Sequence, residues 1–473
     1  MAELSQPDVG SIEQADYLVR AAVDFMVDLY PIAEAHVSYR EKENVLDYAG
    51  DGKARRGAFP THRDVRAVPT RPNCQRMLNL TLNDDISRFV GKDAGTYLEA
   101  AFDRLTIAMD LAHAWTEQLG PSSHKETREA VQSALPTHIL AHVMADRYAR
   151  VTGEDTFQFA HHRDDGEHDT LADTIVESLE YMDALARSRV EDQDLSHGVV
   201  IVSSDKGAPP VSPGRYPRDF QPLKRTPLLA DGYQSALLLT TDGRAVSLLT
   251  PDHLPSLSDD SRHDFGSLGF LARSSARYEG VGLMLRPGGS LVTFAGERPL
   301  YIRRSGQWRD MMWDLIRNVM VKRYGDVGAK VFDTALILTT SGRGGILAVM
   351  EEVDPKGIND KDRVDLAQAV SSDDAEDREM PPEWLFHRLL STDSIAGMSS
   401  RSLAQLAGID GATIVGEDGN LLAYGAIVSS VQGRSEGART AAARTLSEQG
   451  LVLRISEDGP IQLFEQGNSL LTV

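Results

Sequence analysis

The sequence predicts a mixed α/β fold in the C-terminal two thirds of the chain, with a mixed sheet and flanking helices, preceded by an all-α N-terminal domain. Apolar residues recur with helical spacing through roughly the first two hundred residues. From Ser196 onward, short β-branched runs alternate with helical segments, a pattern typical of sheets covered by helices. A chain of 473 residues has room for about three domains. We therefore expect a helical domain at 1–195, an α/β module at 196–305 and a second α/β domain at 306–473.

Several amphipathic helices are expected in the N-terminal domain, because each segment carries an apolar stripe with polar residues outside it. They span residues 11–30, 93–119, 124–151 and 168–190. Ser11, followed three positions later by Gln14, forms a capping-box pattern at the start of the first helix. The stretch 45–75 is rich in Gly, Pro, Arg and Asp, and it predicts a long loop.

Most of the chemically notable histidines lie in this domain. His138 and His142 are four residues apart on one predicted helix, a spacing that can place two imidazoles on one metal ion. His161, His162 and His168 cluster among acidic residues. Since neither group has a recognised ligand spacing, we expect the first pair to line a packed face and the second group to lie in a solvated loop.

The module at 196–305 begins with a β-branched strand at 199–202. A loop rich in Pro, Gly and Ser follows at 203–227. Residues 236–239 and 245–249 then predict a hairpin around the turn at Asp242 and Gly243.

A weak internal repeat links this module to the end of the chain. Residues 272–296, a basic helical run followed by two apolar runs, can be laid beside residues 438–467. The earlier copy has Pro287 where the later one reaches its carboxylates, so we expect a related, sensor-like module without catalytic acids. Chance similarity between two helix–hairpin units is the alternative.

The C-terminal domain is expected to begin with a helix at 308–324, where apolar residues form a stripe. A glycine-led strand follows at 345–350. The acidic stretch 354–383 predicts an exposed insertion.

Composition narrows the function class. The net charge of −21 argues against nucleic-acid binding, since neutralising phosphates requires a basic surface. The single cysteine, Cys74, excludes an internal disulfide framework and favours a reducing compartment. With no apolar run near the roughly 20 residues of a membrane span and no visible secretory signal, we expect a cytoplasmic protein without a membrane partner.

Three short motifs near the C-terminus carry the candidate chemistry. Asp410 and Gly411 precede an apolar strand, Gly437 and Arg439 open a short basic helix, and Glu457 ends a later strand. A glycine-led helix start with an arginine suits a phosphate group. Two carboxylates are hard oxygen ligands that can share Mg²⁺ or Mn²⁺ bridging that phosphate. The order acid, basic helix start, acid predicts a nucleotide–metal site.

The same residues resemble the diadenylate cyclase domain family, which carries Asp-Gly-Ala, Gly-Thr-Arg-His-Arg and Ser-Glu-Glu in this order. Asp410, Gly411 and Ala412 match the first motif, and Ser456 and Glu457 match the last. The middle motif keeps its glycine and first arginine. The other three positions differ: Ala438, Thr440 and Ala441 stand where the family has Thr, His and Arg, respectively. The resemblance covers about the last third of the chain.

The resemblance implies a metal-dependent nucleotidyltransferase that condenses two ATP molecules into the second messenger c-di-AMP, releases pyrophosphate and acts as a face-to-face dimer. Asp410 and Glu457 would hold the metal, and with Gly411 they form the implied catalytic set. The implied nucleotide-binding set is Gly411, Ala412, Gly437, Ala438, Arg439, Thr440 and Ser456. Because Thr440 and Ala441 replace two phosphate contacts, two alternatives stay open: a nucleotide sensor without catalysis, and a dimerising scaffold.

Overall fold

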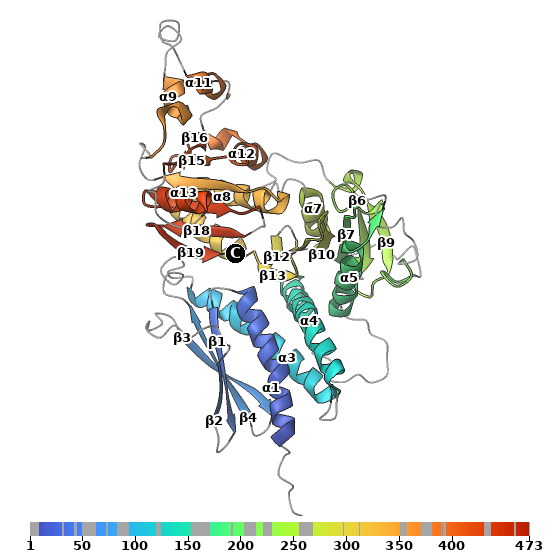
Figure 1. Ribbon diagram of the computed structural model, residues 1–473. Coiled ribbons are helices and arrows are strands. Elements are labelled where there is room, and N and C mark those ends of the chain that lie inside the picture. Colours follow the sequence, from blue (N-terminus) through green and yellow to red (C-terminus); the bar gives the residue numbers. More distant parts are fainter. Residues whose placement is uncertain are drawn as a thin grey trace, which may run out of the picture. The chain divides into compact units, whose positions relative to one another are not determined.

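The computed structural model divides the chain into two compact units (Figure 1). One unit comprises Met1–Leu254 and Phe270–Met311, and the other comprises Pro255–Gly269 and Met312–Val473. The structure describes residues 9–30, 33–41, 45–49, 63–71, 74–82, 94–119, 124–152, 171–190, 193–202, 214–220, 229–254, 268–296, 298–311, 313–350, 357–369, 381–388, 390, 394–429, 437–457 and 460–472. No helix among these residues is long and apolar enough to cross a membrane.

The predicted N-terminal helices are present, although the one expected at 168–190 ends at Ala186 and is followed by a short strand at 189–190. They are α1 (Val9–Leu29), α3 (Ala94–Leu119), α4 (Lys125–Thr152) and α5 (Leu171–Ala186). The apolar stripe of α1 is buried through Leu18, Ala22 and Met26. Since α1 already begins at Val9, Ser11 lies inside the helix and the capping-box prediction is wrong.

The chain between α1 and α3 forms a four-stranded antiparallel sheet. The predicted all-α domain did not include this sheet. Its strands are β1 (Ala33–Glu41), β2 (Val45–Ala49), β3 (Arg63–Arg71) and β4 (Cys74–Leu82), in the order β2-β1-β4-β3. The loop predicted at 45–75 is therefore wrong wherever this segment is described. Its Pro and Arg content is compatible with an edge strand: β3 is at the edge, and its register shifts between Pro69 and Arg71.

The first unit also contains a seven-stranded mixed sheet in the order β13-β12-β11-β10-β7-β8-β9. The strands are β7 (His197–Val202), β8 (Ala236–Thr240), β9 (Ala245–Leu249), β10 (Val281–Leu285), β11 (Leu291–Ala295), β12 (Arg298–Arg304) and β13 (Gln307–Asp310). The helix α7 (Gly269–Arg277) precedes β10, a short ladder joins β5 (Arg189–Val190) to β6 (Gln193–Asp194), and a 3-10 turn, η2 (Pro251–His253), follows β9. The predicted hairpin around Asp242 and Gly243 is confirmed as the β8–β9 pair.

The second unit contains a six-stranded mixed sheet in the order β16-β15-β14-β17-β18-β19. The strands are β14 (Gly345–Met350), β15 (Ala412–Gly416), β16 (Leu421–Ala426), β17 (Gly450–Ile455), β18 (Ile461–Glu465) and β19 (Asn468–Thr472). The helices are α8 (Trp313–Ser341), α9 (Val364–Ala369), α11 (Pro382–His387), α12 (Ser400–Ala407) and α13 (Ala438–Leu446), with 3-10 turns η4 (Asp360–Asp362) and η5 (Ile395–Gly397). The mixed α/β class is thus confirmed, with mixed sheets and helices following an N-terminal region that holds the predicted helices; this region is not all-α, because it also contains the β1–β4 sheet.

The helix predicted at 308–324 begins later than expected, at Trp313. Trp308 instead pairs with Arg303 across the β13–β12 ladder and is buried there. An aromatic residue fits a half-buried strand as well as a helix stripe, so the pairing with β12 decides its conformation.

The two mixed sheets share one strand order. When β13 is set aside, β7 to β12 occupy the positions that β14 to β19 occupy in the other sheet. In each sheet the first strand is parallel to the second and antiparallel to the fourth, and a helix, α7 or α13, leads into the fourth strand. The elements laid side by side in the predicted repeat thus occupy equivalent places in the two sheets.

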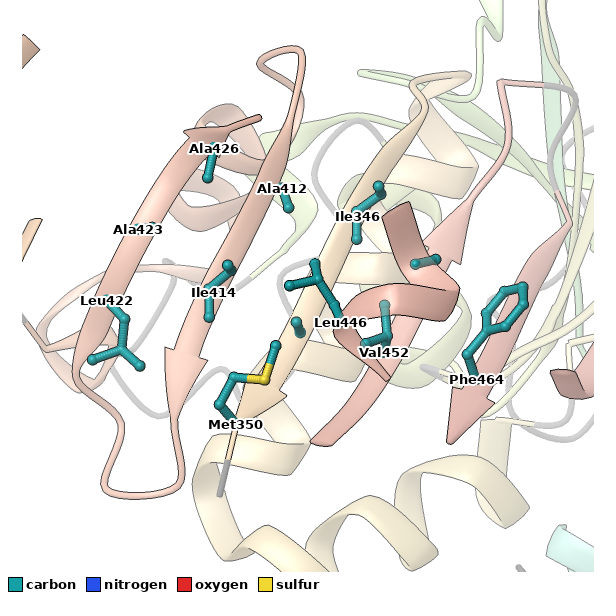
Figure 2. Close-up of a cluster of buried hydrophobic side chains, with 12 residues drawn as sticks. Ile346, Met350, Ala412, Ile414, Leu422, Ala423, Ala426, Leu446, Val452 and Phe464 are labelled. Atoms are coloured by element: carbon teal, nitrogen blue, oxygen red, sulfur yellow. The ribbon is translucent and has the colours of Figure 1, made fainter. Parts of the chain in front are cut away.

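One face of the second sheet is packed against α13 (Figure 2). The residues forming this core are Ile346, Ala348, Met350, Ala412, Ile414, Leu422, Ala423, Ala426, Ala443, Leu446, Val452 and Phe464. Position 345 of β14 faces the other way: a Cβ at Gly345 would lie 3.1 Å from the Leu338 side chain of α8 and 2.5 Å from the Ala407 carbonyl oxygen of α12. The sheet is therefore a middle layer between α13 and the helices α8 and α12, and its strand ends are fixed by both.

A buried histidine lies at the start of β7. The His197 ring is fully buried; its Nδ1 donates to the Ala230 carbonyl oxygen at 2.9 Å, so its Nε2 accepts from the Tyr216 hydroxyl at 2.9 Å. Burial lowers the pKa of His197 to about 4, and the Ala230 hydrogen bond offsets only part of this effect. The ring is therefore neutral in the folded protein.

This histidine predicts a loss of stability in mild acid. The unfolded chain takes up a proton near pH 6.5 whereas the folded ring resists it to about pH 4, so His197 reduces the free energy of unfolding as the pH falls through this window. At pH 5 the expected loss is about 2 kcal/mol relative to pH 7.5. His197→Gln keeps a donor and an acceptor but does not titrate. Urea unfolding at both pH values should give a smaller decrease for this variant, and equal decreases would contradict the prediction.

Candidate functional site

The predicted site lies at one end of the six-stranded sheet. Because β14 is parallel to β15 and antiparallel to β17, the starts of β14 and β15 lie beside the end of β17. Gly345 is paired with Ile455, and Ile346 with Ala412. This register brings the segments just before β14, just before β15 and just after β17 to the same end of the sheet.

Arg439 connects the two predicted acids at this end. Its Nη1 donates to Glu457 Oε1 at 2.9 Å, and its Nη2 lies 3.7 Å from Asp410 Oδ1. The Asp410 side chain is 87% exposed, so it is accessible to a ligand from solvent. The structure thus brings together the three charged residues that the sequence motifs singled out.

Gly344 lies directly beneath the Arg439–Glu457 pair. A Cβ at this position would be 2.5 Å from Arg439 Nη1 and 3.1 Å from Glu457 Cγ. Because Gly344 has no side chain, the Arg439 guanidinium can lie against the start of β14. Gly344 was missed as a site residue, because it reads from the sequence only as the lead-in to a strand.

The second missed residue is Gly425, which crosses Gly411 at close range. Gly411 has φ +116, and a Cβ there would lie 2.4 Å from the Gly425 carbonyl carbon. Gly425 itself has φ +61. The pair of glycines lets β16 pass close to the residue after Asp410, and this crossing fixes the backbone that carries the carboxylate.

We expect Gly411→Ala to destabilise the second unit by at least about 2 kcal/mol, because it combines an unfavourable positive φ with a clash against backbone. Gly344→Ala is the matched control: φ at Gly344 is not in the left-handed region, and the closest atom is the tip of a flexible side chain. Urea unfolding of both variants would check this difference. A Gly411→Ala protein as stable as Gly344→Ala would contradict it.

The other predicted nucleotide-binding residues are close neighbours of these charged residues along the chain. Gly437 is the N-cap of α13 and is exposed, so Ala438 and Arg439 form the first turn, where backbone N–H groups lack helical partners. Thr440 is half-buried in the same turn. The Ser456 N–H donates to the Pro460 carbonyl oxygen at 3.0 Å, which closes the turn after β17.

Ala412 differs from these residues because its side chain is fully buried in the sheet core. It can therefore offer only backbone atoms to a ligand. Its role in the first motif is explained by packing, since a small side chain fits beneath α13 and beside the Gly411–Gly425 crossing.

The two carboxylates fit a magnesium- or manganese-type ion. Mg²⁺ is commonly held by one or two carboxylates with water and substrate phosphates, rather than by a complete protein cage. Among the described residues there is no group of three or more His, Cys, Asp or Glu side chains that could hold a metal by itself. A site of two exposed acids therefore suits an ion that arrives with a phosphate ligand.

At the corresponding end of the seven-stranded sheet, the equivalent residues have different roles from those of the candidate site. Asp231, in the loop before β8, uses Oδ1 to accept from the backbone N–H groups of Tyr233, Gln234 and Ser235 at 2.8, 2.8 and 3.0 Å. This carboxylate closes a tight turn, whereas the Asp410 carboxylate lies beside the Arg439 guanidinium. After β10 the chain continues to Arg286 and Pro287, which supply no acid.

The histidines of the N-terminal region are not gathered into a metal site in the described part of the chain. The His138 ring packs edge-on against Trp115, with ring centroids 4.6 Å apart. Burial lowers the pKa of His138 and of His142, as expected for a packed face. His161, His162 and His168 lie outside the described residues.

Comparison with known proteins gives a partial likeness to a solved structure. No protein-family model matches the chain, and no curated protein is significantly similar to it. The chain is similar to the crystal structure of a double mutant of DacA from Staphylococcus aureus, with 17% sequence identity and a TM-score of 0.22. The similar region covers 31% of this chain and 87% of the DacA chain. At these values the likeness assigns neither a fold nor an activity to this chain.

Proposed function

We propose that residues 313–472 bind ATP together with a divalent metal ion and act as a diadenylate cyclase. One observation carries the proposal: Asp410, Arg439 and Glu457 come from three separate segments and meet at one end of the sheet. Their order along the chain is that of the diadenylate cyclase motifs. An aspartate that only closes a turn, or a glutamate that only ends a hairpin, would not have to lie beside the other two charged residues.

The reaction requires positioning and charge neutralisation more than covalent help from the protein. The 3′-hydroxyl oxygen of one ATP forms a bond to the α-phosphorus of a second, and the bond from that phosphorus to the β-phosphate oxygen breaks, which releases pyrophosphate. A second, reciprocal step closes the ring. Asp410 would orient the attacking hydroxyl and accept its proton. Arg439 and the first turn of α13 would bind phosphate oxygens.

Asp410 and Glu457 would hold Mg²⁺ or Mn²⁺ in this scheme. When bound, the ion would neutralise charge on the α-phosphate and polarise it. Two exposed isoleucines, Ile409 before Asp410 and Ile427 shortly after Gly425, offer apolar surface suited to the face of a base. Because one site holds one ATP, two copies of the chain are required, and we expect a homo-oligomer.

The seven-stranded module is proposed to be a non-catalytic relative of this domain with a regulatory, sensor-like role. Its strand order supports the relationship, and the use of Asp231 in a turn argues against metal chemistry there. No role in nucleic-acid binding is proposed, in keeping with the net charge of −21.

A second candidate is a nucleotide sensor without catalysis. It is favoured by Thr440 and Ala441, which supply neither the imidazole nor the second guanidinium of the family's middle motif. This candidate shares the site and differs only in turnover. The scaffold alternative uses none of the three charged residues and leaves their common position without explanation.

Incubation of the full chain with ATP and Mn²⁺, followed by chromatography and mass spectrometry, tests the proposal. We expect c-di-AMP and pyrophosphate in a 1:2 ratio, as the reaction requires. Calorimetry with a non-hydrolysable ATP analogue distinguishes the alternatives. Binding without product would favour the sensor, and absence of both binding and product would reject enzyme and sensor together.

A further inference from the structure

Arg439 has two possible groups of partners in the proposed site: the acids that it contacts in this structure and the phosphates of a nucleotide. It bridges Glu457 and Asp410 with different nitrogens, 2.9 and 3.7 Å from their oxygens. A divalent ion bound by the same oxygens would lie about 2.1 Å from each of them. The guanidinium and the ion therefore compete for the same carboxylate oxygens.

The charges of the competing groups determine whether the guanidinium or the metal ion occupies the two acids. Without nucleotide, a divalent ion entering beside Arg439 would meet a fixed positive charge and would have to break the contact with Glu457. A nucleotide triphosphate offers the guanidinium another, more strongly charged acceptor, and bidentate arginine–phosphate pairs are among the strong charge-assisted contacts. Movement of Arg439 to the phosphate would withdraw its positive charge from both acids and so favour the metal.

We propose that Arg439 is an internal counter-ion that excludes divalent metal from Asp410 and Glu457 until a nucleotide phosphate binds the guanidinium. This inference rests on the proposed function, because it assigns a regulatory role to the same site. Its consequence is that metal alone binds weakly and that metal and nucleotide promote each other's binding, as linkage requires.

Gly344 makes the inference testable without removing the arginine. An added methyl group at this position would come within 2.5 Å of Arg439 Nη1, and this flexible group can move away at small cost to the fold. Gly344→Ala should therefore displace the guanidinium from Glu457 while keeping its charge. Arg439→Ala removes the group altogether.

The experiment measures Mn²⁺ binding to the full chain by electron paramagnetic resonance of the free ion, without nucleotide. Exposed ion pairs are modest, so we expect affinity for Mn²⁺ alone to rise about 5-fold in Arg439→Ala and by a smaller factor in Gly344→Ala. The gain must disappear when Asp410→Asn is added, which separates this site from other acidic surface. Arg401→Ala, which removes an exposed arginine from α12, is the control and should match the unmodified protein.

Addition of a non-hydrolysable ATP analogue completes the test. In the unmodified chain the analogue should strengthen Mn²⁺ binding at Asp410 by about 10-fold or more, a typical coupling between linked ligands. Unchanged Mn²⁺ affinity in both Arg439→Ala and Gly344→Ala would overturn the inference, even if ATP is bound and converted. Failure of the unmodified chain to bind the analogue at all would instead reject the proposed function.

Discussion

Asp410→Asn is expected to reduce formation of c-di-AMP by about 100-fold or more, since removal of a group that acts only on the reacting centre commonly costs two to three orders of magnitude. The substitution keeps the size of the side chain but removes the charge that would hold the metal and accept the hydroxyl proton. Asp410 is 87% exposed, so little effect on stability is expected. Glu457→Gln should give a similar loss, because both acids would share one ion.

The assay for this prediction is initial-rate product formation at saturating ATP and Mn²⁺, together with thermal unfolding of each variant. Glu448→Gln provides a matched control, since it removes one exposed charge from the turn after α13 without touching the site. Product formation by Asp410→Asn at the rate of the Glu448→Gln control would show that the acids are not used, and the enzymatic proposal would fail.

Arg104→Met is expected to lower the free energy of unfolding of the first unit by about 3–5 kcal/mol, the usual cost of removing one partner from a buried ion pair. Arg104 of α3 donates through Nη1 to Oη of Tyr30, which directly follows α1, at 2.6 Å and to Asp310 Oδ2 of β13 at 3.0 Å. Tyr30 Oη lies 3.0 Å from Tyr301 Oη of β12. Burial raises the pKa of both tyrosines, so their hydroxyls remain neutral.

The reason for this large effect is that only 7% of the Asp310 side chain is exposed. Without Arg104 its carboxylate loses a charged partner in a region that water reaches poorly. Urea unfolding measures the loss. Arg309→Met, next to Asp310 on β13, is the control and should cost far less. Adding Asp310→Leu to Arg104→Met should recover part of the stability, whereas a further additive loss would show that the ion pair is not the cause.

The sequence was most informative where one local signal sufficed. The apolar stripes of the N-terminal helices, the Asp242–Gly243 turn and the strand at 345–350 are local patterns, and each element is present within a few residues of its predicted bounds. The sequence was misleading where pairing with another strand decides the conformation of a segment. The strands around Pro69 lack a strong strand composition, and Trp308 fits a helix stripe until β12 is available as a partner.

For the candidate site, the sequence determined which groups are available: two acids, one arginine near a helix start, and glycines beside them, in a fixed order. It could not determine that these groups meet, because Asp410, Arg439 and Glu457 are separated by whole secondary-structure elements. Only the tertiary structure decided this, through the parallel pairing of β14 with β15 and the antiparallel pairing of β14 with β17. The same pairing placed Gly344 beneath the guanidinium, a role that has no local signal because it depends on contact with a side chain about ninety-five positions away.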